Sequence, residues 1–82
     1  MNLEKEFSDN MELRVLLLAL YKKEENETFK DILQTLEKGG LFTFKNGKKL
    51  LKLLKDLKYI TDDGFTMLGL QKAKEVEMEF KI

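Results

Sequence analysis

Apolar residues recur at the three- and four-residue spacing of an α-helix through most of the chain, and this pattern constrains the fold more than any other feature. A first helix is predicted from a cap at Asp9, with Glu12 reaching back to it, to about Lys23. Its apolar stripe consists of Leu13, Leu16, Leu17 and Leu20. Val15 and Leu18 widen that stripe, so we expect this helix to be central or covered by a partner.

A second helix is predicted to begin at Thr28, which can cap it together with Asp31 three residues later. Its apolar face has the same helical spacing, with Phe29, Ile32, Leu33 and Leu36. We expect the helix to end at Gly39-Gly40, because glycine readily adopts the left-handed conformation that follows a helix. Leu33 lies in the middle of the stripe and is predicted to be a core residue.

A third helix is predicted from a cap at Asn46 to about Lys58. Leu54 lies in the middle of its apolar side and is predicted to be in the core. The preceding segment, residues 41–44, fits either a loop or an extended piece that plugs the core. The boundaries of this helix matter because it carries most of the lysines discussed below.

Residues 59–67 predict a tight β-hairpin whose arms are Tyr59-Ile60-Thr61 and Phe65-Thr66-Met67. The turn is Asp62-Asp63-Gly64, and an Asp-Gly pair is a strong turn signal because both central residues of such turns need a positive φ. The two aspartates are interpreted as turn residues, since the further oxygen ligands of a calcium loop are absent. A last helix is predicted from about Leu68 towards Phe80.

Length and composition limit what this fold can do. The 82 residues suffice for one domain, residues 1–82, with one modest core, and we expect residues 1–8 to be flexible. There is no cysteine and no histidine, which removes disulfides, the commonest metal ligand and the usual proton shuttle. No catalytic triad or phosphate-binding glycine loop is present. We therefore predict a protein that is not an enzyme and that needs no cofactor or metal.

The N-terminal residues also bear on the compartment. The segment 1–6 is acidic and mixed in charge, unlike the basic start of a signal peptide. The longest apolar run, residues 15–20, is far shorter than the about 20 residues of a membrane span. The cytoplasm is therefore the predicted compartment, and no membrane partner is expected.

The predicted order of helix, helix, helix, hairpin and helix resembles the winged helix-turn-helix family over about Met11 to Phe80. The residues that carry this resemblance are Thr28-Phe29-Lys30-Asp31-Ile32-Leu33, Leu50, Leu54, Leu57-Lys58-Tyr59-Ile60, the Asp-Asp-Gly hairpin and Thr66-Met67-Leu68-Gly69-Leu70. The resemblance implies a mainly α fold with a small β-hairpin, in which a three-helix core is followed by a short wing and a C-terminal helix. It also implies that the third helix enters the major groove of DNA.

Two features depart from the pattern of that family. The link from Gly39 to Lys45 is longer than the three- or four-residue turn of a tight helix-turn-helix. The tip of the predicted wing carries Asp62 and Asp63, which would repel phosphates. We therefore expect no DNA contacts from the wing.

The third predicted helix has a lysine-rich face. At about 100° per residue, four of its lysines fall within about one third of the circumference, opposite Leu50, Leu53, Leu54 and Leu57. These four are Lys48, Lys49, Lys52 and Lys55. Lys48 and Lys52 are like charges at a destabilising spacing, and Lys48 and Lys49 lie where the helix dipole disfavours cations. A face shaped only for stability would carry acids there. From residue 41 to 60 there are six lysines and one acid, a local charge of +5, whereas the whole chain is neutral.

The sequence therefore predicts a non-enzymatic protein that binds double-stranded DNA, as a small transcriptional regulator or accessory factor. The predicted DNA-binding residues are Lys45, Asn46, Lys48, Lys49, Lys52 and Lys55, with Lys58 extending the surface. One alternative is a face that is merely solvated. The other is a protein-interaction module whose lysine face meets an acidic partner, without DNA binding.

Base-reading residues are scarce in this sequence. The only arginine, Arg14, lies on the first helix, so Thr43 and Asn46 are the nearest candidates for a base contact. Phe42 and Phe44 could stack on bases, but core packing is the interpretation that we favour.

A homodimer through the C-terminal helix is also predicted. The apolar residues Leu70, Ala73, Val76 and Phe80 continue past the point where a three-helix core is complete. Val15 and Leu18 also extend the apolar surface of the first helix beyond its core stripe, so this helix could contribute to the same interface. The alternative is that the last helix packs back onto its own domain.

Overall fold

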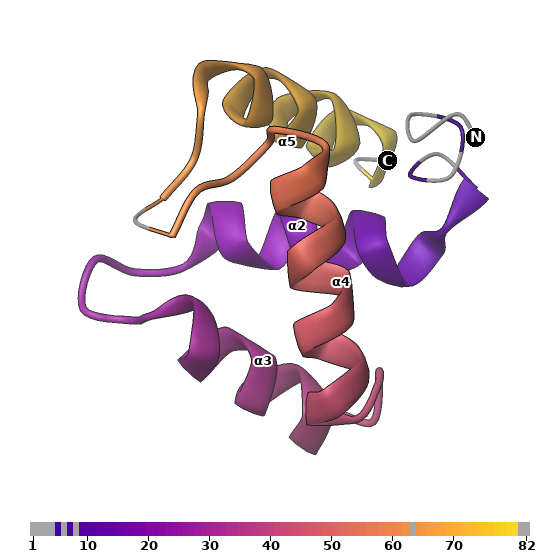
Figure 1. Cartoon of the computed structure of the whole chain (residues 1–82), viewed down its shortest axis with the longest axis vertical. Coiled ribbons are helices and arrows are strands. Elements are labelled where there is room, and N and C mark those ends of the chain that lie inside the picture. Colours follow the sequence, from indigo (N-terminus) through magenta and orange to yellow (C-terminus); the bar gives the residue numbers. More distant parts are fainter. Residues whose placement is uncertain (1–4, 6, 8, 63, 81–82) are drawn as a thin grey trace.

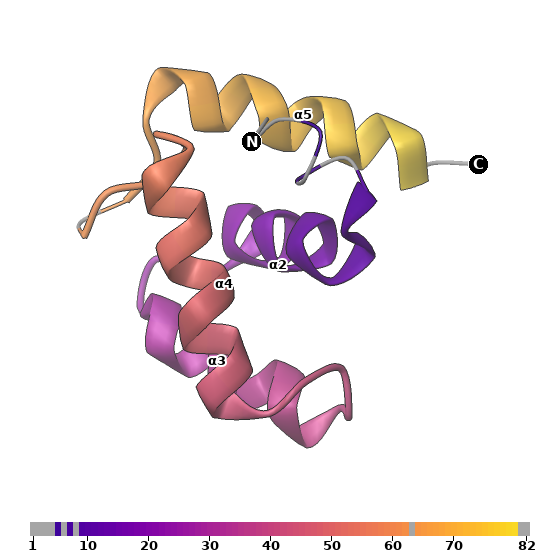
Figure 2. The same cartoon turned by 45° about the vertical axis from the view of Figure 1, so that its right-hand side comes forward.

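The computed structural model describes residues 5, 7, 9–62 and 64–80, and its regular elements are α-helices (Figure 1). Within these residues the helices are α2 (Met11–Lys22), α3 (Phe29–Lys38), α4 (Phe44–Asp56) and α5 (Met67–Phe80). Figures 1 and 2 show α2 between α5 on one side and α3 on the other, with α4 running across it. The first helix of the sequence pattern is thus the central one.

The α2 helix buries all four leucines of its predicted stripe. Its cap differs from the predicted Asp9 by one residue, because the side-chain oxygen of Asn10 accepts from the backbone N–H of Leu13 at 3.1 Å. The helix ends at Lys22, close to the predicted end.

The α3 helix begins as predicted. The Thr28 hydroxyl accepts from the N–H of Asp31 at 3.1 Å, and the Asp31 carboxylate accepts from the N–H of Thr28 at 3.0 Å. This second hydrogen bond holds the pKa of Asp31 below its ordinary value. After the helix, Gly40 has a φ of 83°, and Leu41 N–H donates to the Leu36 carbonyl at 3.1 Å. A left-handed residue at this point reverses the chain towards α4.

The α4 helix begins three residues earlier than predicted, because Thr43 and not Asn46 is its cap. The Thr43 hydroxyl accepts from Asn46 N–H at 3.2 Å, and a Glu37 carboxylate oxygen accepts from Phe44 N–H at 2.7 Å. The ambiguous segment 41–44 therefore divides, with Phe42 buried in the core, as favoured above, and Phe44 on the first turn of the helix. The connection between α3 and α4 shortens to residues 39–43.

The predicted β-hairpin wing is wrong, and with it the winged helix-turn-helix fold class. Among the residues that the structure describes there is no strand, only a single bridge between Ile60 and Phe65. A turn does form there, since Thr61 N–H donates to the Gly64 carbonyl at 2.7 Å. The arms are too short for a ladder, because the left-handed turn at Lys58 ends α4 directly before Tyr59 and the Thr66 hydroxyl already caps α5.

The chain reverses sharply between α4 and this turn. Lys58 has a φ of 68°, and Tyr59 N–H donates to the Leu54 carbonyl at 3.1 Å. The Thr66 hydroxyl then accepts from Gly69 N–H at 2.9 Å and donates to the Lys58 carbonyl at 2.6 Å. These bonds fix the first turn of α5 against the end of α4.

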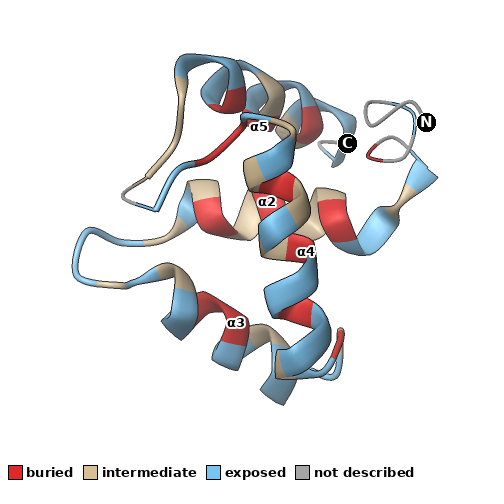
Figure 3. Ribbon diagram, in the orientation of Figure 1, coloured by how far each residue is buried: buried red, intermediate tan, exposed pale blue. Residues whose placement is uncertain are grey.

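Buried residues occur on each of the helices α2 to α5 (Figure 3), and their side chains form one cluster. Leu33 and Leu54 belong to it, which confirms their prediction as core residues. The expected flexibility of residues 1–8 falls mainly on residues outside the described part of the chain. Phe7, which is described, is buried edge-to-face against Tyr59, with ring centroids 5.3 Å apart.

Candidate nucleic-acid interface

The α4 helix presents a buried side and a lysine-rich side, as its pattern predicted. Gly47, Leu50 and Leu54 face the core. The opposite side carries four exposed lysines, which we call the lysine surface: Lys45, Lys48, Lys49 and Lys52. The structure thus brings together four of the five lysines predicted to bind DNA.

The lysine surface is not neutralised by the chain itself. Within the described residues, none of its four ammonium groups forms an ion pair with a carboxylate. Lys48 has its Nζ 5.6 Å from the centroid of the Phe44 ring, a cation–π contact within the helix. Four like charges therefore face solvent along two turns of one helix.

Lys55, the fifth predicted lysine, is placed differently. Its Nζ donates to the Asp62 carboxylate at 2.5 Å, across the turn that follows α4. The ammonium group lowers the pKa of Asp62, first through the hydrogen bond and then through its charge. The Lys55 side chain is 40% exposed and that of Asp62 is 86% exposed, so the pair lies at the surface. Lys58, beyond the helix end, is exposed.

Asn46, the sixth predicted residue, is exposed on the first turn of α4. The Thr43 hydroxyl, the other candidate for base contact, is used by the helix cap. Of the two candidates for a base contact, Thr43 therefore uses its side chain to cap α4, and the side chain of Asn46 takes no part in the cap.

Two residues that the sequence analysis missed position the lysine surface. A Cβ on Gly47 would lie 2.7 Å from Cε1 of Phe42 and 3.0 Å from Cδ2 of Leu33, so glycine allows α4 to approach α3 closely. Glu37 ties the end of α3 to the start of α4 through its bond to Phe44 N–H. The role of Gly47 could have been predicted, because a glycine inside a helical pattern indicates close approach of another segment. The role of Glu37 could not, because nothing in the local sequence links it to a helix that begins seven residues later.

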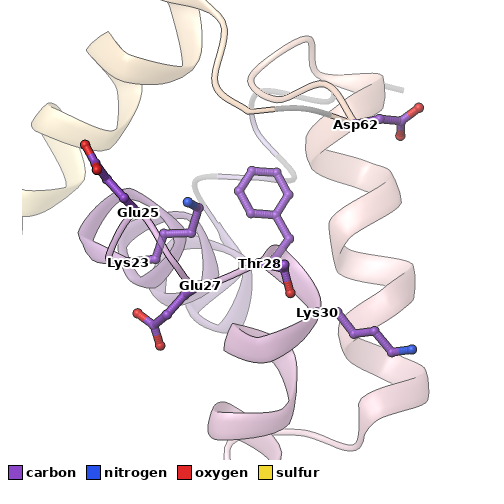
Figure 4. A pocket seen from close by; sticks show the side chains of 7 residues that line it. Lys23, Glu25, Glu27, Thr28, Lys30 and Asp62 are labelled. Carbon is purple, nitrogen blue, oxygen red and sulfur yellow. The ribbon is translucent and has the colours of Figure 1, made fainter.

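A shallow hollow of about 450 Å³ lies beside the start of α3 (Figure 4). Its lining combines both signs of charge: Lys23, Glu25, Glu27, Thr28, Phe29, Lys30 and Asp62. The side chains of Lys23 and Lys30 point in different directions in Figure 4, so they do not converge on one anion. The hollow therefore does not indicate a ligand site.

Comparisons of the chain with family models, curated proteins and solved structures find no significant match. They neither support nor oppose the family resemblance drawn from the sequence. In the described part of the chain, no group of three or more candidate metal-binding side chains comes together. None of its helices is both long enough and apolar enough to cross a bilayer.

Proposed function

We propose that this protein binds double-stranded DNA without catalysing a reaction, and that the lysine surface of α4 contacts phosphates. The observation that carries the proposal is the set of four exposed lysines between residues 45 and 52, without carboxylate partners among the described residues. Phosphates would relieve the repulsion between these ammonium groups, and released counterions would drive association.

The charge distribution supports this proposal. Residues 41–60 carry six lysines and one aspartate, or +5, and the whole chain is neutral, so the other 62 residues carry −5. Such asymmetry orients α4 towards a polyanion and turns the rest of the surface away from it.

The position of the lysine surface on α4 also supports the proposal. It occupies residues 45–52, the N-terminal part of the helix. The positive end of the helix dipole adds to the lysine charges there and favours phosphate. We extend the proposal to a small transcriptional regulator or accessory factor, with the cytoplasm as the expected compartment.

Fluorescence anisotropy of a labelled random-sequence duplex at several salt concentrations tests the proposal. Four phosphate contacts predict that log K falls with log salt with a slope of about −3 to −4, at about 0.9 per phosphate. Absence of binding at the lowest salt concentration would overturn it.

A second candidate function is binding of an acidic protein partner. The Lys55–Asp62 pair favours it, because one lysine of α4 already holds a carboxylate. Competition by polyglutamate distinguishes the two functions. If DNA is the partner, duplex should displace bound polyglutamate at a much lower concentration of negative charge than polyglutamate needs to displace bound duplex. If polyglutamate is the stronger competitor, the acidic protein partner is supported.

Substituting Asp62 is expected to strengthen DNA binding. Asp62→Asn frees Lys55 for one further phosphate, which should steepen the log–log salt slope by about 0.9. The thermal stability should change little, because exposed ion pairs contribute little. Asp9→Asn, with the same change of charge far from α4 in the chain, is the matched control. An unchanged slope for Asp62→Asn would show that Lys55 does not reach DNA.

The same ion pair predicts a pH dependence. Lys55 lowers the pKa of Asp62, so the pair is intact at neutral pH and is lost as the pH falls through that lowered pKa. Replacing Lys55 with glutamine should therefore raise the pKa of Asp62 towards its ordinary value, which a carboxyl nuclear magnetic resonance titration of the free protein measures. An unchanged pKa in Lys55→Gln would contradict this cause.

The homodimer stays a prediction, but the apolar residues that could form its interface are only partly those expected from the sequence. Ala73 and Val76 are buried in the core of their own chain, as α5 packs on α2. The large apolar side chains exposed on α5 include Leu70 and Phe80 from the predicted set, together with Met67 at 81% and Met78 at 74%. If the dimer forms through them, sedimentation at high micromolar concentration should give twice the 9.7 kDa chain mass, and Met78→Lys should restore the monomer. A monomer throughout would contradict it.

A further inference from the structure

Asn46 is the one uncharged polar side chain within the α4 sequence, and it is exposed at the edge of the lysine surface. Its backbone N–H donates to the Thr43 hydroxyl, but no hydrogen bond in the described part of the chain uses its side-chain amide. A side-chain amide offers a donor and an acceptor side by side. Adenine presents the matching pair, the N7 acceptor and the N6 donor, on its major-groove edge.

The other candidates for base reading are engaged elsewhere. The Thr43 hydroxyl caps α4. The only arginine, Arg14, pairs with Glu79 and lies over the Phe80 ring, 5.3 Å from its centroid. A guanidinium held between α2 and α5 cannot reach a base that α4 contacts. Among these side chains, Asn46 is the one left to discriminate between bases.

The backbone of Asn46 is held in place from both sides along the chain. Thr43 bonds its N–H, and the next residue, Gly47, packs tightly on Phe42 and Leu33. Lys49, three residues later, is its nearest lysine around the helix, and Lys45 immediately precedes it in the sequence. Phosphate contacts fix the register of a protein on the duplex, and base contacts then specify sequence.

We propose that Asn46 reads an adenine in the major groove and gives the lysine surface a preference for an A·T pair at one position. This inference rests on the proposed DNA binding. It goes further by naming the base and the residue that selects it.

Selection from a random duplex library, followed by affinity measurement, tests the inference. The unmodified protein should enrich duplexes with one fixed A·T pair, and Asn46→Ala should lose the preference at that position alone. Changing the pair to G·C should weaken the unmodified protein roughly tenfold to a hundredfold and leave Asn46→Ala almost unchanged. Asn26→Ala, in the exposed loop between α2 and α3, is the matched control and should keep the preference.

The outcomes separate this inference from the function beneath it. If the protein binds duplexes with the expected salt slope but enriches no A·T position, or if Asn46→Ala keeps the preference, the inference is overturned and phosphate binding stands. If the unmodified protein binds no duplex at any salt concentration, both are overturned. Circular dichroism of Asn46→Ala should match the unmodified protein, so that lost preference is not lost folding.

Discussion

The Gly69→Ala variant is expected to lose about 4 kcal/mol or more of its free energy of unfolding, an exceptional loss for one methyl group. A Cβ at this position would lie 1.8 Å from the carbonyl oxygen of Tyr59 and 2.6 Å from its carbonyl carbon. These are backbone atoms, which cannot turn aside as a side chain can. Tyr59 is buried, and its carbonyl accepts from Thr66 N–H at 3.1 Å, so α5 would have to leave its place.

Urea unfolding followed by circular dichroism measures this loss. The matched control is Gly39→Ala, because a Cβ on Gly39 would make only ordinary contacts at 3.6 Å and its φ of −77° suits any residue. That control should stay within about 0.5 kcal/mol of the unmodified protein. A Gly69→Ala midpoint equal to that of the control would show that α5 does not sit against Tyr59 as described.

Removing the lysine surface is expected to have the largest effect on function. Changing Lys45, Lys48, Lys49 and Lys52 together to glutamine removes four proposed phosphate contacts, so the log–log salt slope should fall by about 3 to 4. At low salt, the duplex affinity should fall by several orders of magnitude. The fold should be kept, because these side chains are exposed and have no ion pairs among the described residues.

The control for this variant changes the same number of lysines outside α4, at Lys23, Lys30, Lys38 and Lys74, which likewise have no ion pairs among the described residues. It alters the net charge equally, so it separates a surface effect from a general charge effect. Equal loss of affinity in both variants would mean that binding follows net charge and not the lysine surface.

Much of this helical fold follows from local sequence, because the spacing of apolar residues decides which side of a helix is buried. The Thr28–Asp31 cap was predicted correctly, since both of its bonds lie within one turn. The cap of α4 was not, because it depends on contacts made elsewhere. Phe42 is buried in the core and Glu37 of α3 bonds Phe44 N–H, which together start the helix at Thr43.

The hairpin shows the same limit. The Asp-Gly signal concerns a turn, and the chain does turn between Thr61 and Gly64. A strand ladder also needs free residues on both arms. Here the left-handed turn at Lys58 ends α4 directly before Tyr59, and the Thr66 hydroxyl caps the next helix. The way α5 docks against the end of α4 therefore sets the length of the arms, and the local pattern does not contain that packing.

The candidate site was predictable to the extent that it depends on one helix. The four lysines share a side of α4 because of helical geometry alone. The pairing of Lys55 with Asp62 depends on how the chain turns after the helix. Ala73 and Val76 were expected at a dimer interface but are buried in their own chain. Only the packing of α5 on α2 determines which apolar residues of α5 remain exposed.

The most direct test of the central claim, that the lysine surface of α4 binds DNA, is a nuclear magnetic resonance titration of the ¹⁵N-labelled protein with a random-sequence duplex. If the lysine surface binds DNA, the amide signals of residues 44–52 should shift most, and those of Met67 and Met78 on α5 should stay in place. Largest shifts on α5, or no shifts at a saturating duplex concentration, would contradict it.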